Sequence, residues 1–326
     1  MRAPGAVLRI GTRSSALAVW QTERVRELLH AAGQETQRVE IKTTGDLTPD
    51  VPLARIGSRA LFTKQIDDAL LDHRIDLAVH SLKDLPTELP LGITIAAIST
   101  REDARDALVG RGPLRWSEIP RGAVIATSSL RRRAQLLASR PDLQIVDVRG
   151  NVDSRLVKLD GRPEWTAIVL ATAGLVRLGL AHRIGERLPA HVMLPAPGQG
   201  ALAVTVRTDD TAVRWSVRRA AHDADTARQV AAERAFLHRL EGGCQVPVAA
   251  FAQPSSEEGR PGLRLHGRVI SLGGERMAEG QLAAAVGDEA SAASLGTTLA
   301  ERLIAEGASS ILAEVRAAAP AVVTEP

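Results

Sequence analysis

The chain has 326 residues, of which 44% are hydrophobic and 24% charged, as is usual for a folded globular protein. Single hydrophobic cores stop growing at roughly 250–300 residues, so we expect two or three domains. No apolar run approaches the roughly 20 residues of a membrane-spanning helix, and no secretory signal precedes the first strand-like run. We therefore expect a cytoplasmic protein without membrane contact.

The net charge is only +3, but lysine occurs at just four positions, so most of the 41 basic residues are arginines. Aromatic residues make up 2% of the chain and tyrosine is absent, which weakens a nucleic-acid interaction based on bases stacking against aromatic rings. The single cysteine, Cys244, cannot form an internal disulfide or build a cysteine metal site by itself, so we expect no bound metal.

The N-terminal part alternates short strand-like runs with longer segments of helical period, the pattern of α/β sheets in which helices connect parallel strands. Val7–Thr12 is the first predicted strand. Ser14 or Ser15 is a candidate N-cap for the helix that follows, and Gly33 ends that helix. A later strand over Ile75–His80 enters a turn that contains Pro86.

The segment Thr43–Phe62 contains Gly and Pro, has little periodicity, and is long for a loop in a compact domain. A mobile lid over an active site and a disordered surface loop both fit this pattern, and the residues do not distinguish them.

A second α/β lobe is predicted after Ala123, where three strand-like runs each lead through a polar turn into a helix. The Pro- and Gly-rich segment Leu194–Gly200 then predicts a crossing or hinge. After Ala220, a helix, strands with a hairpin signal at Gly273–Gly274, and two further helices predict a small α+β domain.

Arginine accompanies possible N-cap residues at three turns that follow predicted strands. In open α/β sheets this edge binds ligands, and helix N-termini attract anions, so three such turns predict a polyanion site. A solvated basic face in an arginine-rich protein is the alternative for any one of them. The turns are Thr12-Arg13-Ser14-Ser15, Thr127-Ser128-Ser129-Leu130-Arg131-Arg132-Arg133, and Arg149-Gly150-Asn151 followed by Arg155.

The second of these turns is physically unusual because Arg131, Arg132 and Arg133 fall in the first turn of a predicted helix. The helix dipole disfavours cations there by roughly 0.3–1 kcal/mol each. A carboxylate or phosphate of a ligand would offset this penalty.

Two residues are candidates for chemistry. Asp84, beside Lys83 and after the strand that ends at His80, could stabilise a developing cation while it moves a proton, although an Asp before a Pro turn is commonly only a cap. His80 fits a packed core position better than a catalytic one. Cys244 lies in a Gly-Gly-Cys turn that could expose its thiol, but an inert buried cysteine fits too.

Many strings of the chain, in the same order, resemble the hydroxymethylbilane synthase (porphobilinogen deaminase) family. This succession of motifs is far more specific than any one of them. The strings are LRIGTRSSALAVWQ, PLARIGSRALFTK, DLAVHSLKDLP, ATSSLRRRAQL, VRGNVDSRLVKLD, LATAGLVRLGL, APGQGALAV and AERAFLHRLEGGCQVP.

The resemblance implies an α/β fold of two lobes like those of periplasmic binding proteins plus a smaller α+β C-terminal domain. Lobe 1 would comprise residues 1–101 and 198–220, lobe 2 residues 102–197, and the third domain residues 221–326. It also implies a monomeric transferase that condenses four porphobilinogen molecules, with loss of ammonia at each step, and releases hydroxymethylbilane for porphyrin and heme biosynthesis.

The resemblance also assigns residues. Cys244 matches the cysteine that holds a dipyrromethane cofactor through a thioether, and Asp84 matches the catalytic aspartate, which would assist loss of ammonium and stabilise the resulting cation. Residues matching substrate contacts are Arg13, Arg149 and Arg177. Residues matching contacts to the cofactor's acetate and propionate groups are Lys83, Ser129, Arg131, Arg132 and Arg155, with Ser15 and Thr127 beside them.

Two other functions remain open from the residues alone. A bilobed α/β chain with anion-holding turns could be a binding protein without catalysis, although the usual periplasmic version would carry a signal segment. A nucleic-acid-binding protein would rest only on the high pI and the arginines.

Overall fold

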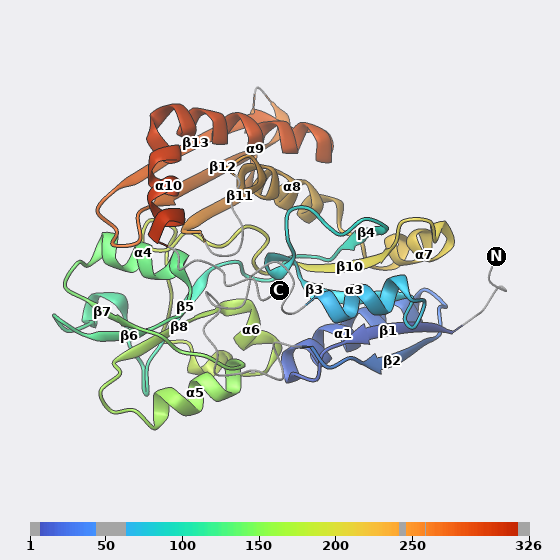
Figure 1. The fold of residues 1–326 in the computed structure, drawn as a ribbon, viewed down its shortest axis with the longest axis horizontal. Coiled ribbons are helices and arrows are strands. Elements are labelled where there is room, and N and C mark those ends of the chain that lie inside the picture. The colour runs from blue at the N-terminus through green and yellow to red at the C-terminus, as the bar shows by residue number, and fades with distance from the viewer. Residues whose placement is uncertain (1–6, 44–62, 241–245, 258, 319–326) are drawn as a thin grey trace.

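The computed structural model describes residues 7–43, 63–240, 246–257 and 259–318, which form three units, each with its own sheet. In Figure 1 the first lobe lies at the lower right, the second at the lower left, and the third unit above them. Cys244 and nearly all of the predicted loop Thr43–Phe62 lie outside the described residues. The fold class is the predicted one, α/β with two lobes and a smaller α+β unit.

The first lobe has a five-stranded sheet in the order β2-β1-β3-β10-β4. Its hydrophobic core includes Ile10, Leu77 and Val204, against which helices pack Val25 and Val217. The strands are β1 (Leu8–Thr12), β2 (Thr36–Glu40), β3 (Leu77–Ser81), β4 (Ile93–Ile98) and β10 (Leu202–Arg207), and the helices are α1 (Ala16–Ala31), α3 (Lys64–Leu71) and α7 (Thr211–Ala221).

The second lobe repeats this plan with the strand order β7-β6-β8-β5-β9. Leu136 of one helix packs on one side of the sheet with Ile125, whereas Leu156 and Leu175 of two other helices pack on the other side with Ile168. The strands are β5 (Asp106–Val109), β6 (Val124–Ala126), β7 (Gln144–Val146), β8 (Ala167–Ala171) and β9 (Glu186–Arg187), and the helices are α4 (Leu130–Ser139), α5 (Val152–Asp160) and α6 (Thr172–Arg177).

Both lobe sheets are mixed, whereas the sequence pattern predicted parallel strands. β10 runs antiparallel to β3 and β4, and β5 runs antiparallel to β8 and β9. The reason is that the chain crosses between the lobes twice, after β4 into β5 and after β9 into β10, and each arriving strand enters its sheet in the opposite direction. The predicted crossing at Leu194–Gly200 is confirmed.

The two crossing segments lie against each other. The backbone N–H of Glu102 donates to the carbonyl of Gly200 over 3.1 Å. Gly200 has φ +93°, and a Cβ there would lie only 2.3 Å from the carbonyl oxygen of Glu102. Only glycine fits such a close approach with this backbone conformation.

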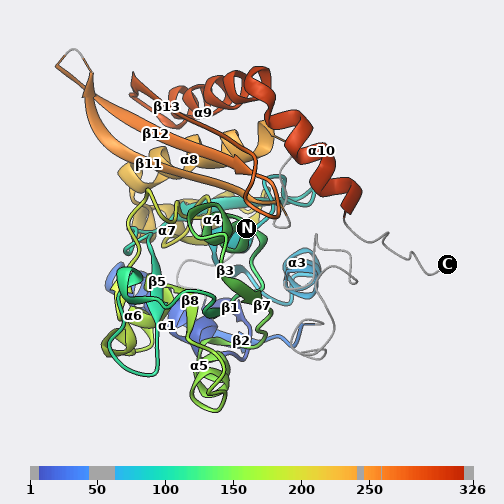
Figure 2. The same cartoon turned by 90° about the vertical axis from the view of Figure 1, so that its left-hand side faces the viewer.

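The third unit is an antiparallel sheet, β11-β12-β13, with helices packed on one face (Figure 2). Phe236, Leu265 and Leu299 are fully buried between helices and sheet. The predicted hairpin at Gly273–Gly274 is confirmed, since it joins β12 to β13 and Gly274 has φ +86°. The elements are β11 (Val248–Glu257), β12 (Arg260–Ile270), β13 (Met277–Ala285), α8 (Ala224–Arg239), α9 (Glu289–Leu303) and α10 (Ser309–Ala318).

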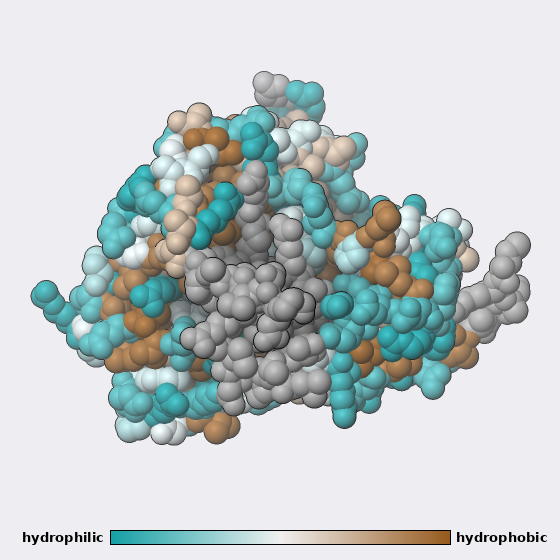
Figure 3. Space-filling view, viewed as in Figure 1, coloured by the Kyte–Doolittle hydropathy of each residue, from teal (hydrophilic) through white to brown (hydrophobic). Residues whose placement is uncertain are grey.

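None of the helices in the described part of the chain is both long and apolar enough to cross a membrane. On the face seen in Figure 3, hydrophobic residues form separate groups among hydrophilic ones.

Candidate active site

The predicted turn after β3 is a short 3-10 segment, Leu82–Asp84. Leu82 is fully buried, and its backbone N–H donates to the carbonyl of Ala201 over 3.0 Å. This anchor leaves Lys83 half-buried and Asp84 exposed. The ammonium of Lys83 donates to Oε1 of Gln199 over 3.2 Å, which joins the turn to the crossing segment. Burial lowers the pKa of Lys83 to about 8, and the neighbouring Asp84 opposes this effect.

The arginine-rich turn before α4 has the predicted geometry. Ser129 is the N-cap, and its Oγ accepts the backbone N–H of Arg132 over 3.4 Å. Oγ1 of Thr127 accepts the backbone N–H of Ser129 over 3.3 Å. Arg131 and Arg132 therefore lie in the first helical turn, where both are buried, whereas Arg133 is exposed.

Both buried arginines contact one fully buried carboxylate, Asp106, the first residue of β5. Nη1 of Arg131 lies 2.8 Å from Oδ2, and Nη2 of Arg132 donates to Oδ1 over 2.7 Å. Burial raises the pKa of Asp106, but Arg131 and Arg132 lower it by more, so the carboxyl stays ionised far below its ordinary range. The helix-dipole penalty is thus offset in part by an internal anion, where the sequence predicted a ligand.

Arg155 of α5 joins the same region. Its Nε donates to the carbonyl of Gly150 over 2.7 Å. Burial lowers the pKa of Arg155 to about 10; Arg132 and Arg149 lower it further, whereas Asp84 raises it. Arg132, Arg149 and Asp84 therefore each lie near enough to Arg155 to change its pKa. The turns that precede α4 and α5 therefore converge beside Asp84, as the topology predicted.

The first arginine-bearing turn precedes α1, for which Ser15 is the N-cap; its Oγ accepts the backbone N–H of Ala18 over 3.3 Å. Arg13 lies near His80, since burial first and Arg13 second lower the pKa of His80 to about 4. His80 is buried and lies 3.1 Å from Oγ1 of Thr205, which confirms the predicted core position.

Arg177, at the end of α6, contacts the crossing segment instead of the Asp106 cluster. Its Nη2 donates to the carbonyl of Gly200 over 2.6 Å, and its guanidinium lies 5.7 Å from the ring centroid of Trp20. Burial lowers the pKa of Arg177 to about 10, whereas the neighbouring Glu102 raises it.

Sequence reasoning missed three buried polar residues that organise this region: Asp106, Gln199 and Glu233. The carboxylate of Glu233 in α8 accepts hydrogen bonds from both Nη atoms of Arg101, at 2.7 and 3.0 Å. It also accepts one from the backbone N–H of Gly198, at 2.7 Å. A charged residue at the start of the apolar run Asp-Ala-Leu-Val was the available signal for Asp106. Gln199 lay within a motif that was interpreted only as a crossing.

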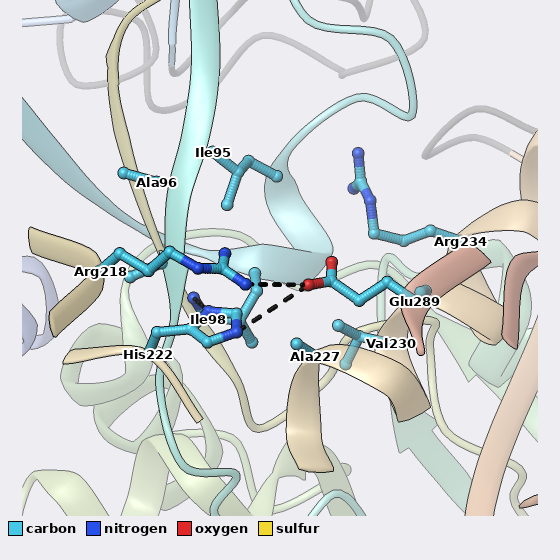
Figure 4. Close-up of a pocket in the computed structure, with 11 residues that line it drawn as sticks. Ile95, Ala96, Ile98, Arg218, His222, Ala227, Val230, Arg234 and Glu289 are labelled. Carbon is cyan, nitrogen blue, oxygen red and sulfur yellow. Dashed lines mark hydrogen bonds and ion pairs between the residues drawn. The ribbon is translucent and has the colours of Figure 1, made fainter. Parts of the chain in front are cut away.

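A cavity of about 190 Å³ lies elsewhere, between β4, α7, α8 and the start of α9 (Figure 4). Arg218 and His222 point toward Glu289, at 3.5 and 3.9 Å, over apolar side chains that include Ile95 and Val230. None of the predicted site residues lines this cavity. Across the described residues, no group of three or more His, Cys, Asp or Glu side chains could hold a metal ion.

Comparison with known families gives two matches along the chain. Residues 8–215 match "porphobilinogen deaminase, dipyromethane cofactor binding domain", and residues 227–305 match "porphobilinogen deaminase, C-terminal domain".

Curated relatives agree with these matches over nearly the whole length. The chain is 47% identical over 310 residues to a porphobilinogen deaminase of Geobacter metallireducens, covering 94% of each chain. It is 49% identical over 312 residues to that of Desulforudis audaxviator, covering 95% of this chain and 98% of the relative. Among solved structures, the methionine-binding protein MetQ aligns with 65% of this chain and 89% of its own at 12% identity and a TM-score of 0.41.

Proposed function

The chain belongs to the porphobilinogen deaminase family, and on that premise we propose that it is a hydroxymethylbilane synthase. This transferase joins four porphobilinogen molecules head to tail on a dipyrromethane primer and then releases hydroxymethylbilane by hydrolysis, in porphyrin and heme biosynthesis. The observation that carries the proposal is the group of cations at Lys83, Arg131 and Arg132, which one internal carboxylate, Asp106, does not neutralise.

The residues present fit a polycarboxylate cofactor. Arginine and lysine side chains are the usual partners of carboxylates, and they are strongest where water is largely excluded. The hydroxyl oxygens of Ser15, Thr127 and Ser129 accept backbone N–H groups, so each O–H remains available to donate to a ligand. We propose that these hydroxyls, with Lys83, Arg131, Arg132 and Arg155, hold dipyrromethane carboxylates and that Cys244 anchors the group. When bound, the dipyrromethane supplies the pyrrole that attacks incoming substrate.

Asp84 is proposed as the catalytic acid–base. Its carboxylate is exposed at the end of the 3-10 turn, beside Lys83 and Arg155. It would hold the aminomethyl group of porphobilinogen as ammonium and assist its departure as ammonia. The carboxylate would then stabilise the positive charge left on the substrate carbon and accept the proton released after the new carbon–carbon bond forms.

Substrate carboxylates need cations of their own. We propose Arg13, Arg149 and Arg177 for this role. Arg149 lies beside Arg155, and Arg13 lies beside the strand that carries the Asp84 turn. Arg177 is held against the carbonyl of Gly200, two residues before the start of β10.

The finer assignments are also proposals. We propose a cytoplasmic monomer that binds no nucleic acid, divided into lobe 1 (residues 1–101 and 198–220), lobe 2 (102–197) and a third domain (221–326). The membership of the three sheets supports this division. Size-exclusion chromatography with light scattering tests the monomer, and salt-dependent binding of DNA would contradict the expected lack of nucleic-acid affinity.

Incubation with porphobilinogen while bilane formation is followed tests the function. Asp84→Asn should lower turnover by about 10²–10⁴-fold, the usual contribution of a positioned acid–base group. The control is Glu88→Gln, which neutralises an exposed carboxylate four residues further along and should keep turnover unchanged. Full turnover by Asp84→Asn would contradict the assigned role, and a wild-type chain that forms no bilane would favour a binding protein.

A further inference from the structure

Asp106 is a carboxylate at the centre of a site proposed to bind carboxylates. It is fully buried at the start of β5, where the first crossing segment enters lobe 2. Oδ1 of Asp106 accepts from Nε of Arg132 at 3.0 Å and from Nη2 at 2.7 Å. Nη1 of Arg132 donates to the carbonyl of Val169 over 2.8 Å. Asp106 and β8 therefore fix the plane of this guanidinium.

Arg131 is held in a similar way from a second direction. Its Nη1 lies 2.8 Å from Oδ2 of Asp106 and donates to the carbonyl of Leu194 over 2.7 Å. Each arginine thus contacts both Asp106 and a backbone carbonyl of a different segment. This double attachment holds both guanidiniums in single orientations.

Asp106 also acts on Lys83 through Gln199, which is almost fully buried. Nε2 of Gln199 donates to Oδ1 of Asp106 over 3.1 Å and to the carbonyl of Ala104 over 2.7 Å. Because the amide nitrogen is used by these two acceptors, Oε1 must face the other way, where it accepts from Lys83 over 3.2 Å. The carboxylate thereby fixes which end of the amide meets the lysine.

The charge balance explains why an anion is needed here. Two buried guanidiniums without a counter-charge would repel each other and carry a large desolvation cost. Asp106 relieves this repulsion but leaves the site positive, because Lys83, Arg131 and Arg132 still outnumber the carboxylates of Asp106 and Asp84. The site can therefore form before any ligand arrives and still attract a polyanion.

We propose that Asp106 is a positioning residue, an internal counter-charge that aligns Arg131 and Arg132 directly, and Lys83 through Gln199, for the carboxylates of the dipyrromethane. The inference rests on the proposed function for the identity of the ligand. The alignment itself rests only on residues of this chain.

The direction in which Asp106→Asn changes the rate of covalent loading distinguishes alignment of the arginines from an effect of net charge. Asp106→Asn removes a negative charge, so a site governed by net charge alone would bind a polyanion faster and more tightly. Alignment predicts the opposite. We expect the cofactor-free variant to gain the mass of two pyrrole units about 10–100-fold more slowly than the wild type after porphobilinogen is added, a loss typical of removing a group that orients a ligand-binding side chain.

The matched control is Asp103→Asn, which changes a more exposed carboxylate three residues earlier that pairs with Arg105 and Arg187. This control should load at the wild-type rate. Rates are expressed per folded molecule, from circular dichroism and urea unfolding, so that a structural defect alone does not change them. Loading by Asp106→Asn at the wild-type rate or faster would overturn the proposal.

Gln199→Met and the binding of citrate provide two further tests of the role of Asp106. If Asp106→Asn does not fold, Gln199→Met leaves both arginine pairs intact and should slow loading about 2–10-fold, as expected for one hydrogen bond; no slowing would overturn the relay to Lys83. If the wild type gains no mass, the proposed function fails, but citrate binding by calorimetry still tests Asp106. Weaker binding by Asp106→Asn supports alignment, and equal or tighter binding overturns it.

Discussion

Two buried arginine–carboxylate clusters lie beside the crossing segments, and they differ in charge balance. In one, Glu233 pairs with Arg101, its one ion-pair partner among the described residues, and accepts backbone N–H groups of Gly198 and Ala252. In the other, Asp106 is shared by Arg131 and Arg132. Both carboxylates are fully buried, so burial does not distinguish them. The balanced cluster ties the third unit to the crossing, whereas the unbalanced one retains positive charge for a ligand.

The largest expected effect comes from breaking each cluster by a matched substitution. Arg101→Gln leaves the buried Glu233 without its cation, so it should lower the free energy of unfolding by about 3–5 kcal/mol. Arg132→Gln leaves Asp106 still paired with Arg131, so it should lower the free energy of unfolding by less. Only Arg132→Gln should also slow covalent loading per folded molecule, by about 10–100-fold, because it removes a charged hydrogen-bond donor for the ligand. Urea unfolding and intact mass measure the two effects.

If Arg101→Gln slowed covalent loading of the pyrrole units per folded molecule, the two clusters would not differ in their role toward the ligand. Loading of Arg132→Gln at the wild-type rate would contradict the difference in the same way.

A smaller effect concerns His80, which is buried in the first lobe beside Thr205. Its folded pKa of about 4 lies below that of an unfolded histidine, so the fold favours the neutral ring. The stability it contributes is present above pH about 6.5 and is lost as the pH falls toward 4. Between pH 7 and pH 5 we expect His80 to cost about 2 kcal/mol of unfolding free energy.

His80→Gln, which keeps a polar group near Thr205 without this titration, should flatten that part of the pH profile in urea unfolding. The Asp106 cluster should not contribute in this range, because its carboxyl stays ionised. A wild-type profile that is already flat from pH 7 to pH 5 would contradict the assignment.

The smallest effect is expected at the cavity beside Glu289. Arg218 and Glu289 are about half exposed and 3.5 Å apart, and such surface pairs contribute about 0–1 kcal/mol. Glu289→Gln should therefore change the thermal midpoint little and leave loading unchanged. A loading defect in this variant would show that the cavity communicates with the Asp106 cluster.

Local signals in the sequence predicted much of this fold. Hydrophobic period and N-cap residues placed the helices that begin after Ser15 and Ser129, and a Pro- and Gly-rich motif placed the crossing at Leu194–Gly200, because each feature depends on neighbouring residues. Strand direction is not local, and the antiparallel β5 and β10 were missed. Asp106 and Gln199 were missed because they acquire meaning only when they meet, 93 residues apart in the chain.

The candidate site was predicted unevenly. The arginine-bearing turns followed from strand order and helix capping, and the structure brings the turns before α4 and α5 together beside Asp84. Asp84 and Cys244 stood out only through the family resemblance, because an exposed Asp near a Pro turn and a lone cysteine have common structural explanations. The roles of both remain proposals.

The central claim is that the unbalanced cluster holds a polycarboxylate anchored to Cys244. The most direct test is the intact mass of the wild-type chain purified from a host that makes porphobilinogen, beside Cys244→Ser from the same host. The account predicts two added pyrrole units on the wild type and none on Cys244→Ser. An unmodified wild-type chain, or the same addition on both chains, would contradict it.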